Sequence, residues 1–482
     1  MNNRRWRQQA AGMQFKLPPD LIQRIALFIS SSRDWFRYLD AFHGTNTLGN
    51  LEILWQLARL HYNSNDFWPE LHIYSLDEAM VEAIRAVSMY YRVVHFHHVY
   101  DLDLLERCVT PMSDTTFELH QCPQHHHAVT LPLSEWYAKL PTLPISHLTW
   151  SDDEFDANPI EGLLAVLGRM PRLRSLNLDF AAVPSVAAVW RFVKQSSLTD
   201  FSMKNIRTPT NRRGDYMDEW LVDVPDPVMN TTLVDHLTFW LHHQPVQSLQ
   251  LANWTFELTP ASTHELYDAL WHCSTMKKLS FREMRLPHFI PPVMFDVPIQ
   301  IVELELFDCA LDTTDFEALA NGLRRSKVEM LNVGCNVVEP KGIVAIADCL
   351  SDSSIRVLNL IATNLEETGC KALARALPNS HLVELHLGMN GLTNGALLHV
   401  VDALRSSEHL RKLGLQWNAI TMSGAIALTH MLGMRKFVLE VVDLRNNRID
   451  EADEALLKTL VDSFDHVKRM ILTKRDRSDR LA

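Results

Sequence analysis

The sequence predicts an α/β fold in which one short repeat of strand and helix recurs along the chain. Five segments of the C-terminal third share one phrase, which reads LNVGCNVV from Leu331 and LHLGMNGL from Leu385. These repeats begin 27, 27, 28 and 29 residues apart, at Val328, Ile355, Leu382, Leu410 and Leu439. Within each repeat the apolar residues first alternate and then recur in steps of four, which predicts a strand followed by a helix.

The first half of each repeat carries apolar residues at its first, fourth and sixth positions. The alternation of the fourth and sixth positions places their side chains on the inner face of a short strand. A side-chain amide at the ninth position can satisfy backbone groups where the strand turns away, so successive repeats can stack as a ladder. The ninth positions are Asn336, Thr363, Asn390, Asn418 and Asn447.

The second half of each repeat predicts a helix. Apolar residues recur four apart, as at Ile346 and Leu350, and so lie on one helical face. Three repeats carry a glycine where this helix begins, at Gly342, Gly369 and Gly424. Agreement at this many positions resembles the ribonuclease-inhibitor type of leucine-rich repeat. The resemblance implies a horseshoe with parallel strands on its concave side and helices on its convex side.

Weaker registers extend this array towards the N-terminus, and one more at Val467 closes it. We therefore expect about twelve repeats over residues 145–475, with an insertion loop at about 207–232. The ladder is poor in the early repeats, where Trp254 and Met284 occupy two of the ninth positions. The early registers begin at Ile145, Leu173, Leu198, Val246, Met276 and Ile301.

The segment 17–60 carries a different pattern. Leu21 and Phe28 belong to a set of apolar residues at helical spacing, which predicts a first helix. A second helix is predicted over residues 34–42, with Trp35 and Leu39 facing inward, and a third helix is predicted to begin at residue 51.

These features resemble an F-box, which has a Leu-Pro start, an apolar first helix, an acidic residue opening the second helix and a closing Leu-Trp. The usual Val-Cys-x-x-Trp segment is missing, because Ala41, Phe42, His43 and Gly44 stand there instead. The resemblance assigns adaptor binding and helix packing to Leu17, Pro18, Leu21, Ile25, Leu54 and Trp55.

The alternative is that three short helices only cap the apolar edge of the repeat array. With either interpretation, residues 61–144 are expected to form a transitional region between the helical segment and the repeats. Tails are expected at 1–16 and 476–482.

Composition limits the classes of partner. The chain has 46 Lys and Arg against 58 Asp and Glu, a net charge of −12, so nucleic acid is not an expected partner. No apolar run reaches about 18 residues and no signal-peptide core is present, so neither membrane spanning nor secretion is expected. Seven scattered cysteines without a CxxC pair argue against a disulfide framework. We expect the protein in the cytosol, the nucleus or both.

The motifs of nucleotide-binding loops, zinc proteases and nucleophile elbows are absent from the sequence. No acid–base pair stands out either, so we expect a non-enzymatic protein with no catalytic residue and no cofactor.

One dense cluster of residues could supply zinc ligands. The cluster comprises His120, Cys122, His125, His126 and His127, with His95, His97 and His98 upstream. Three adjacent histidines cannot all turn towards one point. The sequence therefore favours exposed histidines in a linker, with no metal site.

Positions five, seven and eight of each repeat are expected to project from the strands and to form a binding face. Position five is polar in most of the later repeats and cannot be core. Large side chains in such a row are candidate interface anchors, although Met389 and Trp417 could instead only cover neighbouring repeats. The candidate partner-binding residues are Arg282, Glu305, Phe307, His386, Met389, Trp417, Asp443 and Arg445.

An F-box followed by leucine-rich repeats resembles the substrate receptors of Skp–cullin–F-box ubiquitin ligases. The resemblance implies that the helical segment binds a Skp-type adaptor, and through it the cullin ligase, while the repeats bind a protein substrate. One alternative is a non-catalytic scaffold or inhibitor similar to ribonuclease inhibitor. Another is a GTPase-activating protein of the kind that stimulates Ran, which would need an arginine such as Arg282 or Arg445.

Overall fold

The computed structural model describes residues 17–60, 64–109, 114–123, 129, 131–151, 160–207, 226–286, 299–462 and 467–472. Several expectations lie outside the described residues. These are the tails at 1–16 and 476–482, most of the insertion loop (208–225), and His125, His126 and His127. The chain divides into two compact units, an N-terminal unit of residues 1–184 and a C-terminal unit of residues 185–482.

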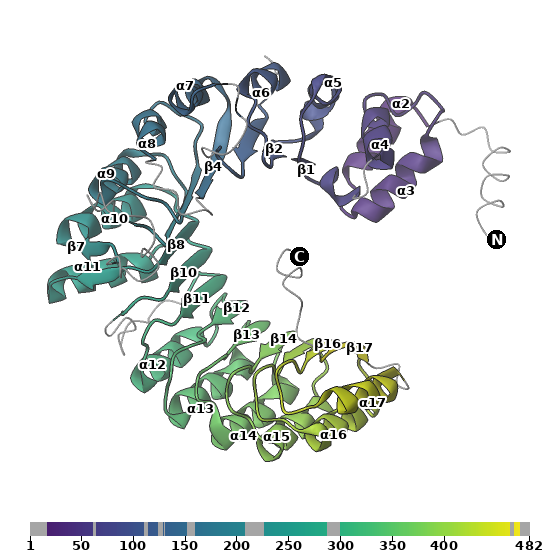
Figure 1. Ribbon diagram of the computed structural model, residues 1–482, viewed down its shortest axis with the longest axis vertical. Coiled ribbons are helices and arrows are strands. Elements are labelled where there is room, and N and C mark those ends of the chain that lie inside the picture. Colours follow the sequence, from purple (N-terminus) through teal and green to yellow (C-terminus); the bar gives the residue numbers. More distant parts are fainter. Residues whose placement is uncertain are drawn as a thin grey trace. The chain divides into compact units, whose positions relative to one another are not determined.

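The described part of the N-terminal unit opens with three helices and continues as alternating strands and helices (Figure 1). Its helices are α2 (Pro19–Leu27), α3 (Ser32–Phe42), α4 (Leu51–Leu60), α5 (Glu78–Val87), α6 (Leu102–Cys108), α7 (Leu133–Lys139) and α8 (Glu161–Leu167). Its strands are β1 (Leu71–Ile73), β2 (Val93–Phe96), β3 (Thr116–Leu119), β4 (Ile145–Ser151) and β5 (Ser175–Asp179). The five strands pair in parallel in chain order.

The C-terminal unit continues the same alternation, with strands on one side and helices on the other (Figure 1). Its main strands are β6 (Asp200–Lys204), β8 (Ser248–Ala252), β10 (Lys278–Arg282), β11 (Glu303–Phe307), β12 (Met330–Asn332), β13 (Val357–Asn359), β14 (Glu384–His386), β15 (Lys412–Gly414), β16 (Leu439–Asp443) and β17 (Val467–Ile471). Each pairs in parallel with the next. A separate parallel pair is formed by β7 (Val228–Asn230) and β9 (Thr255–Glu257).

The helices of this unit pack against their neighbours in two series along the chain, the first from α9 to α11 and the second from α12 to α17. They are α9 (Val186–Gln195), α10 (Thr231–His243), α11 (Pro260–Trp271), α12 (Thr313–Leu323), α13 (Pro340–Cys349), α14 (Glu366–Ala376), α15 (Asn394–Leu404), α16 (Met422–Gly433) and α17 (Glu451–Asp462). Local chemistry fixes several starts. Asp312 and Asp315 form a capping box before α12, Thr393 caps α15, and Pro340 occupies the first position of α13.

The α/β leucine-rich-repeat fold predicted from the sequence is confirmed. A strand follows each of the registers predicted from Ile145 to Val467, and a helix follows the strand in the later repeats as expected. The fourth and sixth positions form the core: Leu331, Leu358 and Leu360 have no exposed surface, and Leu331 pairs with Leu358 across β12 and β13.

The repeats begin earlier than predicted. Residues 61–144 were expected to be transitional, yet β1, β2 and β3 lie there and join the same parallel ladder as β4. Their inward residues are Leu71, Val94 and Phe117, all buried. The pattern is hard to see in the sequence because Val and Phe replace leucine. The expected insertion is also shorter, because β7 and the start of α10 occupy its last residues.

The helical segment 17–60 contains three helices close to the predicted positions, with Trp35 and Leu39 fully buried as expected. It packs on the start of the repeats, because Trp35 stacks on Trp68 at 4.6 Å between ring centroids. Trp68 also donates its Nε1–H to the backbone carbonyl of Ile29. Phe28 departs from the expected helical face: it ends α2 and is 89% exposed.

The predicted asparagine ladder is present. Asn336 is fully buried, and its Oδ1 accepts the backbone N–H groups of Cys309 and Leu311, both at 3.0 Å. Its Nδ2 donates to the carbonyl of Leu306, the sixth position of the preceding repeat, at 2.7 Å. The same bond to the preceding sixth position is made by Asn390, Asn418 and Asn447. Each amide thus joins two repeats.

The early repeats keep one bond of this ladder with different chemistry. Trp254 donates its indole N–H to the carbonyl of Met203 at 3.2 Å, and Cys309 places its thiol 3.2 Å from the carbonyl of Phe281. Both carbonyls belong to the sixth position of the preceding repeat. The ladder is therefore not lost at Trp254. The thioether of Met284 carries no donor hydrogen for this bond.

The eighth position of the later repeats adopts a left-handed backbone conformation without glycine. The angle φ is +53° at Ala362, +57° at Met389, +59° at Trp417 and +58° at Asn446. Each such residue outside glycine carries a backbone strain of about 1 kcal/mol or more. The neighbouring repeats hold the turn in this form, because the N–H groups of Met389 and Trp417 each donate to the next repeat.

Candidate functional site

The strand face of the C-terminal unit presents the positions that alternate with the core. Most of their side chains are half-buried, Ser202 and Ser280 are buried, and the fourth and sixth positions between them belong to the core. The predicted partner-binding residues all lie on this face or at the turns that follow its strands. They do not converge on one point, because they belong to different strands, from β10 to β16.

Met389 and Trp417 are the exposed large side chains of this set, at 54% and 57%. They occupy equivalent turns of adjacent repeats, and the N–H of Met389 donates to the carbonyl of Gln416, directly before Trp417. Their left-handed backbone turns both side chains away from the core. Covering the neighbouring repeat would bury them, so their exposure favours the interpretation as interface anchors.

Glu305 on β11 contacts polar groups of the two neighbouring strands, β10 and β12. It accepts from the Ser280 hydroxyl at 2.6 Å and from the Asn332 amide at 2.8 Å, and it lies 3.6 Å from the guanidinium of Arg282. That guanidinium also lies over the ring of Phe307, 4.8 Å from its centroid. The group is a pre-formed polar and aromatic surface rather than a set of free charges.

Two further pairs lie along the face. His386 is 3.6 Å from Glu384 on the same strand, and burial lowers the pKa of its imidazole. Lys412 on β15 reaches the same carboxylate at 2.7 Å. Arg445 donates its Nε–H to Asp443 at 2.9 Å. Arg445, like Arg282, is therefore engaged by a carboxylate of its own chain, which does not favour the role of an arginine supplied to a partner's nucleotide.

The predicted adaptor-binding residues fall into two groups. Leu17 and Leu21 are 41% and 40% exposed, Pro18 is exposed at the start of α2, and Ile25 is half-buried. Leu54 is fully buried and contributes to helix packing, so it cannot contact an adaptor. Trp55 is half-buried and stacks on His43. Leu54 is therefore a packing residue, whereas the exposed Leu17, Pro18 and Leu21 remain candidates for contact with an adaptor.

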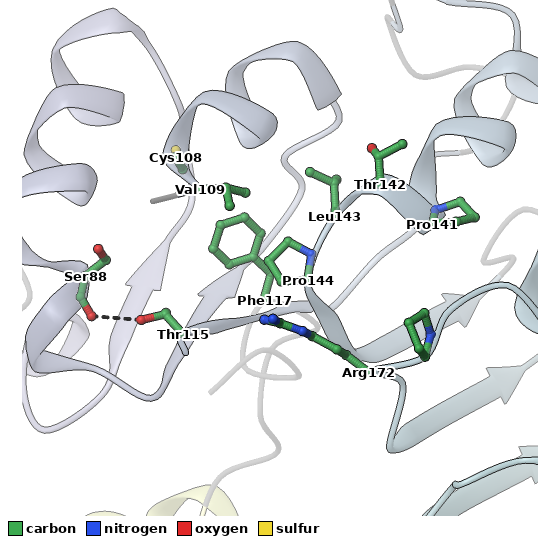
Figure 2. Close-up of a pocket in the computed structure, with 11 residues that line it drawn as sticks. Ser88, Cys108, Val109, Thr115, Phe117, Pro141, Thr142, Leu143, Pro144 and Arg172 are labelled. Carbon is green, nitrogen blue, oxygen red and sulfur yellow. Dashed lines mark hydrogen bonds between the residues drawn. The ribbon is translucent and has the colours of Figure 1, made fainter. Parts of the chain in front are cut away.

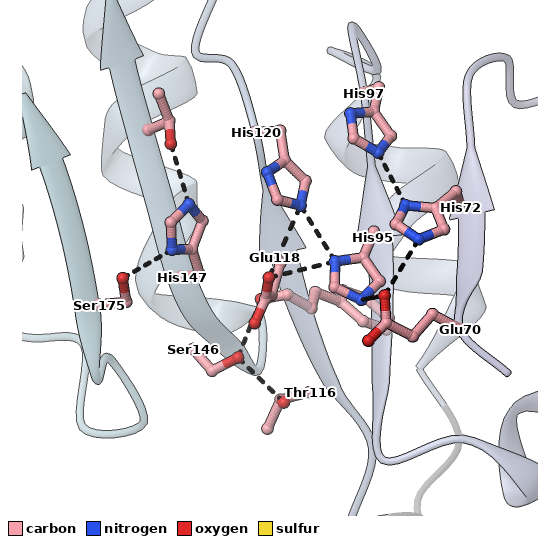
Figure 3. Close-up of polar contacts among 12 residues, drawn as sticks. Glu70, His72, His95, His97, Thr116, Glu118, His120, Ser146, His147 and Ser175 are labelled. Carbon is pink, nitrogen blue, oxygen red and sulfur yellow. Dashed lines mark hydrogen bonds and ion pairs between the residues drawn. The ribbon is translucent and has the colours of Figure 1, made fainter. Parts of the chain in front are cut away.

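The strand face of the N-terminal unit carries a row of histidines, and three of them, His95, His97 and His120, belong to the cluster noted in the sequence (Figure 3). Register places His72 opposite His95, His95 opposite Glu118, and Glu118 opposite His147 across β1 to β4. The rings of His72 and His95 stack at 4.4 Å, and those of His97 and His120 stack at 4.5 Å.

The expectation of exposed linker histidines is wrong for His95, His97 and His120. These residues lie on or directly after strands and are half-buried in the row. Burial beside other histidines lowers the pKa of His97 to about 4 and that of His120 to about 3. Both imidazoles are therefore neutral at neutral pH. His98 is exposed as expected.

Cys122 is buried and does not belong to this row. Its burial raises the pKa of the thiol well above the ordinary value. Glu70, His72, Glu118 and His147 are the members that sequence reasoning missed. The signal was a Glu-x-His spacing at residues 70–72 and again at 118–120, which places both side chains on one face of a strand.

A surface pocket of about 260 Å³ lies elsewhere in the N-terminal unit (Figure 2). Its walls include Phe117, Leu143 and Pro144, and Thr115 donates its hydroxyl hydrogen to backbone carbonyls. Burial raises the pKa of the lining Cys108 to about 12, so its thiol is not an activated nucleophile. None of the described residues that line the pocket carries a carboxylate or an imidazole.

Within the described ranges, every helix is too short or too polar to cross a lipid bilayer.

The exposure of the two anchors leads to a prediction. Met389→Ala and Trp417→Ala are each expected to change the free energy of unfolding by less than about 0.5 kcal/mol, because both side chains project into solvent. Leu415 lies between Met389 and Trp417 in the sequence and is fully buried. Leu415→Ala is therefore expected to reduce the free energy of unfolding by about 2–5 kcal/mol. Urea denaturation followed by circular dichroism measures all three. A cost for Trp417→Ala similar to that for Leu415→Ala would show that Trp417 is a structural residue.

Comparison with known proteins gives a family model described as Leucine Rich repeat, which matches residues 406–428. The matched segment holds strand β15, the ladder residue Asn418 and the first half of α16. No curated protein matches the chain.

Solved structures that are similar to the chain include an internalin and a part of leiomodin. An internalin from Listeria monocytogenes str. 4b F2365 is 13% identical with a TM-score of 0.35, and the match covers 73% of this chain and 92% of the internalin. Actin-Binding Site 2 of Leiomodin-1 is 14% identical with a TM-score of 0.23, and the match covers 34% of this chain and 80% of that one. The matched repeat, together with the repeated strand–helix geometry, supports a leucine-rich-repeat protein that acts as an interaction scaffold.

Proposed function

We propose that this chain is the substrate receptor of a Skp–cullin–F-box type ubiquitin ligase, and that it acts without catalytic chemistry of its own. In this proposal the helices α2 to α4 bind a Skp-type adaptor, which links the chain to the cullin ligase. The strand face of the C-terminal unit binds the protein substrate. Such a ligase works in the cytosol or the nucleus.

One observation carries the proposal: apolar side chains stay exposed on helix α2 and at its two ends. Leu21 on the helix is 40% exposed, and Phe28, the residue that follows the helix, is 89% exposed. Leu17, which lies two residues before the helix, is 41% exposed. Exposed apolar side chains grouped around one short helix suit a protein partner.

A cap alone accounts for only part of this segment. The contact between Trp35 and Trp68 covers the first repeat, which is what a cap must do. That contact gives no reason for exposed apolar residues on α2. The scaffold interpretation, in which the helices only cap the repeats, is the second candidate because the tryptophan contact favours it.

The test is binding of the purified full-length chain to a purified Skp-type adaptor. The double variant Leu21→Ala/Phe28→Ala is expected to weaken binding at least about tenfold, because each truncation removes apolar area from the contact. The matched control is Leu398→Ala on α15, a leucine of similar exposure (44%) in the other unit, which is expected to bind as the wild type does.

Equal binding by the double variant and the wild type would overturn the role given to α2. Absence of adaptor binding by an intact, folded chain would overturn the ligase proposal and leave the scaffold. Circular dichroism of each variant shows whether its fold is intact.

A further inference from the structure

We propose that His95, Glu118 and His120 form a zinc-binding site on the strand face of the N-terminal unit. This inference does not rest on the proposed ligase function. It concerns the part of the histidine row in which three ligand atoms lie closest together (Figure 3).

The strands bring these three residues together through their register. His95 on β2 pairs directly with Glu118 on β3. His120 lies two residues after Glu118, so its side chain is on the same face of the sheet. Residues that are 25 positions apart in the chain thereby become neighbours.

The distances between the ligand atoms suit one tetrahedral zinc ion. Nδ1 of His95 lies 3.0 Å from Nε2 of His120 and 3.1 Å from Oε2 of Glu118, and the third side of the triangle measures 3.6 Å. Bonds of about 2.0–2.2 Å to a tetrahedral Zn²⁺ place ligand atoms about 3.3–3.6 Å apart. The observed triangle needs shifts of only a few tenths of an ångström to accept the ion.

Hydrogen bonding satisfies this triangle poorly. A neutral imidazole carries one N–H, and a single hydrogen on Nδ1 of His95 cannot point at both Nε2 of His120 and Oε2 of Glu118. The carboxylate carries no hydrogen to donate. A divalent cation at the centre satisfies all three lone pairs at once.

The surroundings support the ligand set. The other ring nitrogen of His95, Nε2, lies 3.9 Å from the carboxylate of Glu70, whose negative charge adds to the attraction of this site for a cation. His97 stacks on the ring of His120 and limits its movement. The side chain of His95 is only 12% exposed, whereas those of Glu118 and His120 are 25% and 30% exposed. The fourth position on the ion is therefore open to water or to a group of a bound partner.

A second Glu-x-His pair provides a matched control. Glu384 and His386 on β14 have the same spacing and a similar exposure, 25% and 30%. The residues that pair with His386 on the neighbouring strands are Asn359 and Gly414. Neither is a histidine, so no second imidazole completes a triangle of ligands there.

The experiment uses the full-length chain without a polyhistidine tag, freed of metal by a chelator. It is titrated with Zn²⁺ in competition with a chromophoric chelator. We expect one zinc ion per chain, a loss of affinity greater than about 100-fold in His95→Gln and in His120→Gln, and no change in His386→Gln. Glu70→Gln, which removes the negative charge 3.9 Å from Nε2 of His95 and 3.3 Å from Nε2 of His72, is expected to weaken binding about tenfold.

Two further measurements locate the ion. Co²⁺ bound in place of zinc is expected to show the strong visible absorption of a four-coordinate ion in the wild type, and Glu118→Gln, which preserves the side-chain shape, is expected to lose it. The triple variant His125→Asn/His126→Asn/His127→Asn is expected to bind zinc normally. Zinc binding that disappears in this triple variant but persists in His120→Gln would overturn the proposal, as would the absence of binding by a folded wild type.

Discussion

Replacement of Asn336 by alanine is expected to reduce the free energy of unfolding by about 3–5 kcal/mol, measured by urea denaturation. The amide makes five hydrogen bonds to backbone groups of two adjacent repeats. Alanine leaves the buried N–H groups of Cys309 and Leu311 without an acceptor, and each unsatisfied buried group costs about 1–3 kcal/mol. The loss is large because one side chain serves several backbone groups.

The control for this change is Asn379→Ala, an exposed asparagine in the short 3₁₀ turn after α14. We expect it to alter the free energy of unfolding by less than about 0.5 kcal/mol. If the two variants proved equally stable, the ladder would contribute nothing measurable to the joining of the repeats. The slope of the unfolding curve also reports whether the repeats still unfold together.

The second large effect is expected at Trp254. Trp254→Ala should cost about 3–5 kcal/mol, because a fully enclosed indole is replaced by a cavity. Trp254→Phe keeps a six-membered aromatic ring but removes the five-membered part of the indole and the N–H that donates to Met203, so a smaller cost of about 1–3 kcal/mol is expected. A buried tryptophan without this bond is needed to separate lost packing from the lost ladder bond.

Trp190 is the matched control for the phenylalanine variant. It is equally buried and lies 6.0 Å from Trp254 between ring centroids, but its Nε1 has no hydrogen-bond partner among the described residues. Trp190→Phe is therefore expected to cost less than about 1.5 kcal/mol. Far-ultraviolet circular dichroism is the suitable probe, since each change removes a fluorophore. A greater cost for Trp190→Phe than for Trp254→Phe would contradict the role given to the indole N–H.

Trp254 also shows how far the sequence pattern could be followed. Tryptophan at the ninth position looks like a break in the ladder, because it is neither asparagine nor a small polar residue. In the structure its long side chain reaches the carbonyl of Met203, which is equivalent to the carbonyl of Leu306 that Asn336 reaches. Residue type alone does not reveal this equivalence, because it depends on where the preceding strand lies.

The histidine row illustrates the same limit at the candidate metal site. His95, Glu118 and His120 are separated by up to 25 residues, and only the pairing of β2 with β3 makes them neighbours. Val94 and Phe117 stand at positions where the later repeats have leucine, so the leucine pattern does not predict this pairing. The earliest repeats were consequently not predicted, and the histidines of this region were assigned to an exposed linker instead of to strands.

The sequence by itself determined the repeat length, the strands and helices of the C-terminal third, and the identity of the ladder asparagines. These properties follow from the order of apolar and polar residues within one repeat, which local periodicity encodes. Only the tertiary structure decided which side chains meet across strands, which eighth positions turn left-handed, and which apolar residues of α2 stay exposed. Those properties depend on register and packing between repeats, and no single repeat contains that information.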